Sequence, residues 1–117
     1  MTAYKRGDIV LVDFNPQKRP QEVAKVRPAV IVSDSDLNEI LDLVTVVALT
    51  TNLIEGAEPL RVRLNPREGF EKESDAMVEQ LRSVAKSRIK VRIASITDAE
   101  MQTIEEGIRL MLALESR

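Results

Sequence analysis

The segment KVRPAVIVS, residues 25–33, gives the clearest indication of the fold. Its second half, residues 29–32, is a short apolar run rich in β-branched residues, which is typical of a strand covered on both faces. Pro28 cannot donate a hydrogen bond to a neighbouring strand, so we expect it to mark the strand's beginning. Arg27 would then lie, partly solvated, at the mouth of a buried strand as a candidate anion or phosphate site. A surface arginine beside a strand-starting proline explains the same residues equally well.

The size and composition predict a single domain spanning residues 1–117. A chain of 117 residues is long enough for one core and too short for two. With 44% hydrophobic and 31% charged residues it has the composition of an ordinary globular protein, and no apolar run approaches the length of a membrane span. The amino-terminal residues 1–6, MTAYKR, do not resemble a signal peptide. We therefore expect a cytoplasmic protein without a membrane partner.

The residue types that are absent limit the catalytic groups and metal ligands that this chain can supply. The sequence has no cysteine, which excludes disulfides, thiolate nucleophiles and cysteine-bound zinc. It also has no histidine, the usual acid or base near neutral pH and the commonest transition-metal ligand. Catalysis would have to rest on Arg, Lys, Thr, Ser, Tyr or carboxylates. Asp34 and Asp36 suggest a helix start rather than a metal site, so we expect neither a metal nor another cofactor.

Positive charge is concentrated in two blocks, although the net charge is only −2. Residues 1–28 hold six Lys or Arg against three acids, and residues 80–94 hold five basic residues and no acid. If the fold joins the two blocks, they form a positive face suited to a polyanion. The alternation of Arg88, Lys90 and Arg92 with apolar residues is explained equally well by the exposed face of a strand.

The pattern of short apolar segments predicts a mainly β protein with helices, of the α+β class. Residues 33–36 have the composition of a helix cap, which predicts one helical turn through Ile40. Thr97 to Glu100 is a capping box that opens a carboxy-terminal helix. So many short strands in so few residues favour a small, strongly curved antiparallel sheet or barrel. We expect strands over residues 8–14, 28–32, 43–49, 60–64, 75–82 and 88–93.

The carboxy-terminal helix carries one apolar stripe. We interpret this stripe as core packing, with docking of a partner as a second role. It consists of Met101, Ile104, Ile108, Met111 and Leu112.

Five segments in matching order and spacing resemble the MazF/PemK-type toxins of bacterial toxin–antitoxin pairs. They are RGDIV (6–10), VRPAVIV (26–32), VVALT (46–50), VEQLRSV (78–84) and KSRI (86–89). The resemblance covers nearly the whole chain. It implies an SH3-like barrel, a homodimer, and sequence-specific cleavage of single-stranded RNA without a metal. It also implies a cognate MazE-like antitoxin that inhibits the toxin.

By the same resemblance, the catalytic residues are Arg27 and Thr50. RNA is cleaved when a 2′-hydroxyl attacks the adjacent phosphate, and an enzyme must orient that attack, stabilise phosphorane charge and protonate the leaving oxygen. Arg27 would supply forked donors to the phosphate and Thr50 a hydroxyl donor. The products would be a 2′,3′-cyclic phosphate and a 5′-hydroxyl. The general base stays unassigned, because arginine keeps its proton.

Five further residues are candidate RNA contacts, and none is assigned a catalytic role. Strand alternation would place Gln80 on the opposite face from Glu79. Some family members carry a catalytic arginine where this chain has Met77. Because this chain lacks that arginine, the expected mechanism depends on Arg27 and Thr50. The candidate contacts are Glu22, Lys25, Thr51, Glu79 and Gln80.

Two alternatives remain. A CcdB-type toxin of the same fold inhibits DNA gyrase by binding and cuts no nucleic acid, and in that case Arg27 is structural. The second alternative is an inactive relative of these toxins that only sequesters antitoxin. Under the ribonuclease interpretation, an acidic antitoxin segment would cover the Arg27 site and compete with RNA.

Overall fold

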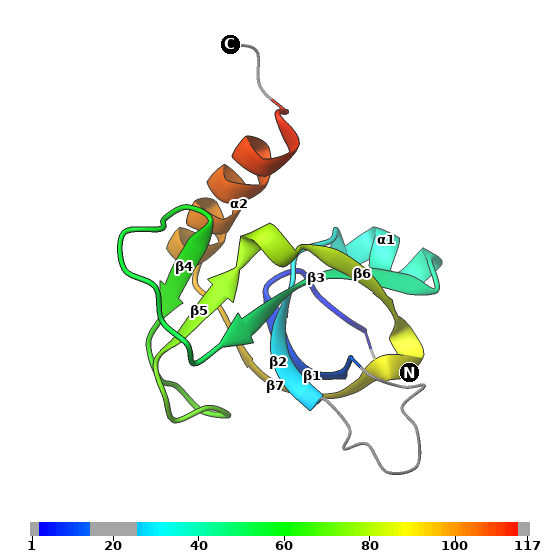
Figure 1. The fold of residues 1–117 in the computed structure, drawn as a ribbon. Helices are drawn as coiled ribbons and strands as arrows, with labels where there is room; N and C mark the ends of the chain where they lie inside the picture. Colours follow the sequence, from blue (N-terminus) through cyan, green and yellow to red (C-terminus); the bar gives the residue numbers. More distant parts are fainter. Residues whose placement is uncertain (1–2, 15–25, 115–117) are drawn as a thin grey trace.

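The computed structural model describes residues 3–14 and 26–114. Most of this chain forms short strands, with one long helix at the carboxy-terminal end (Figure 1). The elements in chain order are β1 (Asp8–Asp13), β2 (Val26–Ile31), α1 (Ser35–Ile40), β3 (Leu43–Thr50), β4 (Arg61–Leu64), β5 (Ser74–Met77), the 3-10 helix η1 (Val78–Gln80), β6 (Arg82–Ala85), the 3-10 helix η2 (Lys86–Arg88), β7 (Ile89–Ser95) and α2 (Asp98–Leu112).

The strands form one antiparallel, strongly curved sheet. The strand order is β4-β5-β3-β2-β1-β7, and β6 pairs with β3 outside this path. In Figure 1, β1, β2, β3, β6 and β7 surround a common centre, while β4 and β5 extend to one side toward α2. Within the described residues the ends of the sheet do not pair with each other, so the barrel is curved but not closed.

Alternating residues of the central strands fill two cores. Ile9, Val30 and Val47 belong to a core that α2 covers. Their neighbours Val10 and Ile31, with others, fill the interior of the barrel. Residues 29–32 are all buried. This confirms the prediction, made from the run of β-branched residues, of a strand covered on both faces.

Both predicted helix starts are confirmed. The Asp34 carboxylate accepts hydrogen bonds from the amides of Asp36 and Leu37, at 3.0 and 3.1 Å, and so caps α1. Thr97 and Glu100 form the reciprocal capping box of α2, which satisfies amides that a helix start leaves open.

The strand that contains Arg27 begins earlier than predicted. β2 starts at Val26, so Pro28 lies inside it and pairs with Leu11 of β1. The prediction was wrong because pairing of β2 with β3 begins only at Ala29, which leaves Pro28 where a ladder donor is not required. Arg27 is therefore an exposed residue within the strand rather than outside it.

The predicted strand over residues 75–82 is also wrong, because it is divided into β5, η1 and β6. One edge of β3 pairs with β6 near its start and with β5 near its end, and η1 carries the chain across this step. Glu79 and Gln80 therefore lie in a 3-10 turn, where strand alternation does not apply.

The predicted alternation along residues 88–93 fails as well. Arg88 belongs to η2, and Val91 in β7 is 50% exposed rather than buried. Two register shifts between β1 and β7 are the physical reason, because each bulge reorients the side chains that follow it.

The apolar stripe of α2 lies only partly in the core. Met101 and Ile104 are buried against β4 and η1, whereas Met111 is 39% exposed and Leu112 is 51% exposed. The core-packing interpretation is thus confirmed for the first half of α2 and wrong for its last turn.

Gly107 allows α2 to contact the segment between β3 and β4. A Cβ atom at this position would overlap the carbonyl oxygen of Pro59 and approach Val78 Cγ1 to 3.1 Å. We expect Gly107→Ala to destabilise the fold by about 1–3 kcal/mol despite the higher helix propensity of alanine. Denaturant unfolding would measure this, with exposed Gln102→Ala in the same helix as the control. A Gly107→Ala variant as stable as the control would contradict the contact.

Candidate functional site

A cavity opens at one mouth of the barrel. Its volume is about 230 Å³, and the ends of several elements contribute to its wall. This arrangement brings residues from the two basic blocks together, as the charge distribution predicted for a positive face. The lining residues are Phe14, Arg27, Ala48, Met77, Gln80 and Arg82.

Arg27 and Thr50 lie on neighbouring strands, β2 and β3. The last pair of the β2–β3 ladder is Ala29 with Ala48, so Arg27 and Thr50 each lie two residues beyond it. Arg27 pairs with Val12 of β1, and Thr50 pairs with Asp75 of β5. Side chains two residues apart on a strand project from the same face, and Ala29 and Ala48 are a pair, so Arg27 and Thr50 project from one face of the sheet. Arg27 is exposed and forms no ion pair within the described residues.

The Thr50 hydroxyl has a defined orientation. Its Oγ1 accepts a hydrogen bond from the Asn52 amide at 3.1 Å, and the residue is half-buried. Since a hydroxyl is both acceptor and donor, its proton stays available to a ligand at the mouth. Thr51, the neighbouring candidate, lies exposed in the bend that follows β3.

Two residues of this cavity were missed by the sequence analysis as site residues. The Arg82 guanidinium lies over the Phe14 ring, with Cζ 5.2 Å from the ring centroid. This cation–π contact holds the second cation at the mouth without neutralising it. The only sequence signal was the position of Arg82 in the second basic block, because the Phe14 contact joins opposite ends of the chain.

The other sequence-predicted residues are distributed differently. Gln80 lines the cavity with Arg27, whereas Glu79 forms an ion pair with Arg61, Oε1 to Nε 2.7 Å. Glu22 and Lys25 lie outside the described residues.

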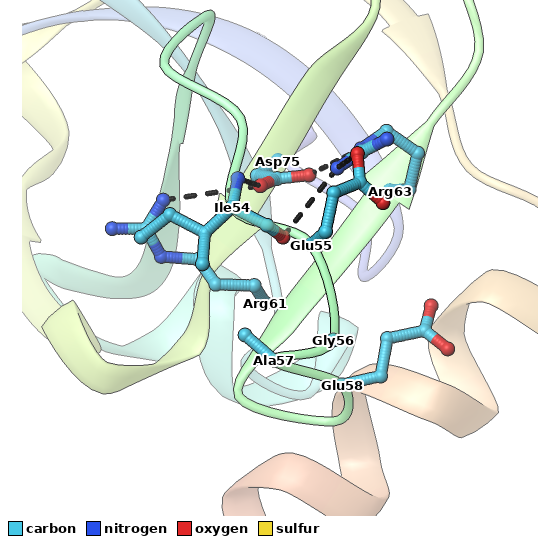
Figure 2. A pocket seen from close by; sticks show the side chains of 8 residues that line it. All are labelled: Ile54, Glu55, Gly56, Ala57, Glu58, Arg61, Arg63 and Asp75. Atoms are coloured by element: carbon cyan, nitrogen blue, oxygen red, sulfur yellow. Dashed lines mark hydrogen bonds and ion pairs between the residues drawn. The ribbon is translucent and has the colours of Figure 1, made fainter.

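A second cavity, of about 350 Å³, lies beside the first, between β4, β5 and the segment that follows β3. Figure 2 shows the Asp75 carboxylate in it between the guanidinium groups of Arg61 and Arg63. Asp75 is only 1% exposed and is bound by Arg63 Nε at 2.6 Å and by the Ile54 amide at 2.9 Å. Its backbone pairs with Thr50, so this cluster is adjacent to the candidate site.

The charges around Asp75 keep it ionised. Burial alone raises the pKa of this carboxyl, but the hydrogen bonds from Arg63 and Ile54 and the charges of Arg63 and Arg61 outweigh burial. The pKa of Asp75 is consequently lowered from its ordinary value. This carboxylate is a structural anion rather than a proton acceptor.

The described residues contain no group of three or more acidic side chains arranged to hold a metal ion. Nor does any described helix have the length and apolar character needed to cross a membrane.

The comparisons with known proteins identify the family. A family model described as PemK-like, MazF-like toxin of type II toxin-antitoxin system matches residues 5–112. The chain is 29% identical over 111 residues to Endoribonuclease EndoA of Bacillus subtilis (strain 168), covering 94% of this chain and 95% of that protein.

Solved structures agree with the fold. A MazE-MazF structure from Deinococcus radiodurans matches with a TM-score of 0.81 at 20% identity, covering 98% of this chain and 100% of that one. Mycobacterium tuberculosis toxin MazF-mt6 matches with a TM-score of 0.77 at 17% identity, covering 93% and 99%. These matches confirm the predicted curved β architecture with a carboxy-terminal helix. The family match confirms the resemblance seen in the sequence, and the chain belongs to the PemK-like, MazF-like toxins of type II toxin–antitoxin systems.

Proposed function

We propose that this protein is an endoribonuclease toxin that cleaves single-stranded RNA, including mRNA, at short sequences without a metal. The observation that carries the proposal is the cavity that Arg27, Arg82 and Gln80 line together, with Thr50 on the same face of the neighbouring strand. Two cations suit a phosphodiester, and the amide of Gln80 can both donate to and accept from a base edge. Membership of the family and similarity to a protein named an endoribonuclease support the same activity over gyrase binding.

In the proposed reaction, the substrate's own 2′-hydroxyl attacks the adjacent phosphorus. Arg27 donates forked hydrogen bonds to the phosphorane oxygens, where negative charge develops in the transition state. The Thr50 hydroxyl, oriented by the Asn52 amide, donates to the same group or to the leaving 5′-oxygen. The 2′-hydroxyl proton passes to solvent water, and the leaving 5′-oxygen takes up a proton. Bond formation to the 2′-oxygen and loss of the 5′-oxygen then give a 2′,3′-cyclic phosphate and a 5′-hydroxyl.

Glu79 is not proposed as the proton acceptor for the 2′-hydroxyl, because its carboxylate forms an ion pair with Arg61. Thr51 and Gln80 are the proposed RNA contacts among the described residues, beside the exposed end of β3 and on η1.

We further propose a homodimer and an antitoxin that covers the mouth. The exposed cations Arg27 and Arg82 would attract an acidic antitoxin segment, which would compete with RNA for the same cavity. The solved MazE-MazF structure of similar fold supports an antitoxin of the MazE type. An mRNA substrate places this activity in the cytoplasm.

Incubating the purified protein with mixed-sequence single-stranded RNA in EDTA tests the proposal. We expect fragments with 2′,3′-cyclic phosphate and 5′-hydroxyl ends. A matched RNA with a single 2′-deoxy nucleotide at the mapped cleavage position should resist cleavage, since it lacks the nucleophile. Absence of RNA cleavage, or equal cleavage of the deoxy substrate, would overturn the proposed reaction.

A further inference from the structure

Two separate segments must be held in register at the mouth of the barrel. One is the segment of residues 51–60 that follows Thr50, and the other is η1, which carries Gln80. The backbone joins the end of the first segment to the start of η1, through the Val78 amide and the Leu60 carbonyl oxygen at 2.9 Å. Asn52 and Glu79 lie away from this bond, so their relative position depends on side-chain contacts. Arg61, the first residue of β4, contacts both of them.

The contacts of Arg61 divide between the two segments. Its Nε donates to Glu79 Oε1 on η1 at 2.7 Å, and its Nη1 donates to the Asn52 carbonyl oxygen at 3.3 Å. Nη1 also lies 3.9 Å from Asp75 Oδ2, a carboxylate that holds the Ile54 amide (Figure 2). The Arg61 side chain is only 14% exposed, whereas its partners Glu79 and Asn52 are more open to solvent.

The neighbouring arginine makes a different set of contacts. Arg63 bonds to Asp75, to Glu55 and to the Ile54 carbonyl oxygen, all within β5 or the segment after Thr50. It therefore holds that segment to the sheet without reaching η1. Among the described residues, Arg61 is the arginine whose hydrogen bonds join both walls of the mouth.

We propose that Arg61 is a positioning residue that fixes Thr50 and Gln80 relative to each other, and that Glu79 acts through Arg61 rather than by contacting RNA. This inference rests on the proposed ribonuclease function. Asn52 is the link to the catalytic candidate, because its amide orients the Thr50 hydroxyl while its carbonyl accepts from Arg61. Glu79 is the link to Gln80, its neighbour on η1.

The fork of an arginine is needed for this role. Nε and Nη1 donate in different directions at the same time, whereas a lysine ammonium is a single point of charge on a flexible stem. Arg61→Lys should thus keep the charge near Asp75 and lose the connection between the walls. A displacement of about 1 Å at a reacting group costs on the order of 100-fold in rate, so the loss should appear mainly in kcat.

A double-mutant cycle of Arg61→Ala and Glu79→Ala tests the proposal on one short RNA substrate. We expect each single variant to lower kcat by about 10- to 100-fold, with a smaller change in KM. The double variant should have about the same kcat as the less active of the two single variants, because both substitutions remove the same connection. If Glu79→Ala lowers kcat/KM by the same factor with and without Arg61, Glu79 acts on RNA directly and the proposal is wrong.

Two controls separate positioning from general stability. Arg67→Ala removes an ion pair of equal length, 2.7 Å to Glu100, that lies away from the mouth, and it should lower stability without lowering kcat. Arg61→Lys should lower kcat while unfolding at nearly the wild-type denaturant concentration. Unchanged kcat in Arg61→Lys, or a similar loss of kcat in Arg67→Ala, would contradict the role.

Amide hydrogen exchange tests the coupling without cleavage. Glu79→Ala should speed exchange of the Ile54 amide, because releasing Arg61 loosens the segment that Asp75 and Arg61 hold. An unchanged rate would overturn the inference even if the wild-type protein cleaved RNA. A wild-type protein that cleaved no RNA but showed this exchange would instead overturn the proposed function alone.

Discussion

Arg27→Ala is expected to lower RNA cleavage by about 100- to 1,000-fold, the usual effect of removing one donor that stabilises charge in a transition state. Arg27 is exposed and makes no ion pair within the described residues, so its loss should change the free energy of unfolding by less than about 0.5 kcal/mol. The variant would be folded and nearly inactive. Initial cleavage rates under single-turnover conditions, with unfolding curves of the same samples, would measure both effects.

Two further variants test whether the loss of cleavage comes from the forked donors of Arg27 or from the loss of a positive charge. Arg27→Lys keeps the charge and removes the fork, so it should recover binding of RNA more than it recovers the rate. Lys72→Ala removes one exposed positive charge from outside the mouth and should leave the rate unchanged. If Arg27→Ala retained more than half of the wild-type rate, Arg27 would not be the phosphate-binding residue.

Asp75→Ala should have the largest effect on stability, a loss of about 2–4 kcal/mol at neutral pH. Removing one member of a buried ion pair leaves its partner without compensation, and the Ile54 amide also loses its acceptor. Asp75→Asn retains an acceptor oxygen and nearly the same volume, so its loss should be smaller. Denaturant unfolding of the three proteins at pH 7 would rank them.

The same variants should respond differently to acid. Because the pKa of Asp75 is lowered in the folded state from the ordinary value of 3.8, the unfolded chain binds the proton more readily. Its contribution to stability is therefore complete well above that value and is lost as the pH falls through the folded-state pKa. The gap in stability between wild type and Asp75→Asn should narrow below about pH 4. A gap that stays constant from pH 7 to pH 3 would show that the charge of Asp75 is not responsible.

The sequence was sufficient where the controlling interactions are local. The apolar run at residues 29–32 and the capping residues Asp34 and Thr97 predicted elements that the structure contains, because burial on two faces and helix capping depend on near neighbours. The resemblance to a known family supplied Arg27 and Thr50. Both lie two residues beyond the last pair of the β2–β3 ladder and on one face of the sheet, and their catalytic roles stay a prediction.

The sequence was insufficient where tertiary pairing decides the local structure. Nothing near Glu79 indicates that β3 changes partner between β5 and β6, so the 3-10 turn at that step was predicted as a strand. The Asp75 cluster was missed for a similar reason, because its bonds to Ile54 and Arg63 span 21 and 12 residues. The Arg82–Phe14 contact is likewise visible only once the barrel is formed.

The pairing of β2 with β3 also determines where the chain can change length during evolution. A shift of one residue in this ladder would turn Arg27 to the opposite face of the sheet and separate it from Thr50. An insertion within either strand is therefore incompatible with the site, whereas the exposed residues 41–42 between α1 and β3 lie outside this ladder. We therefore expect relatives to differ in length at that connection rather than within β2 or β3.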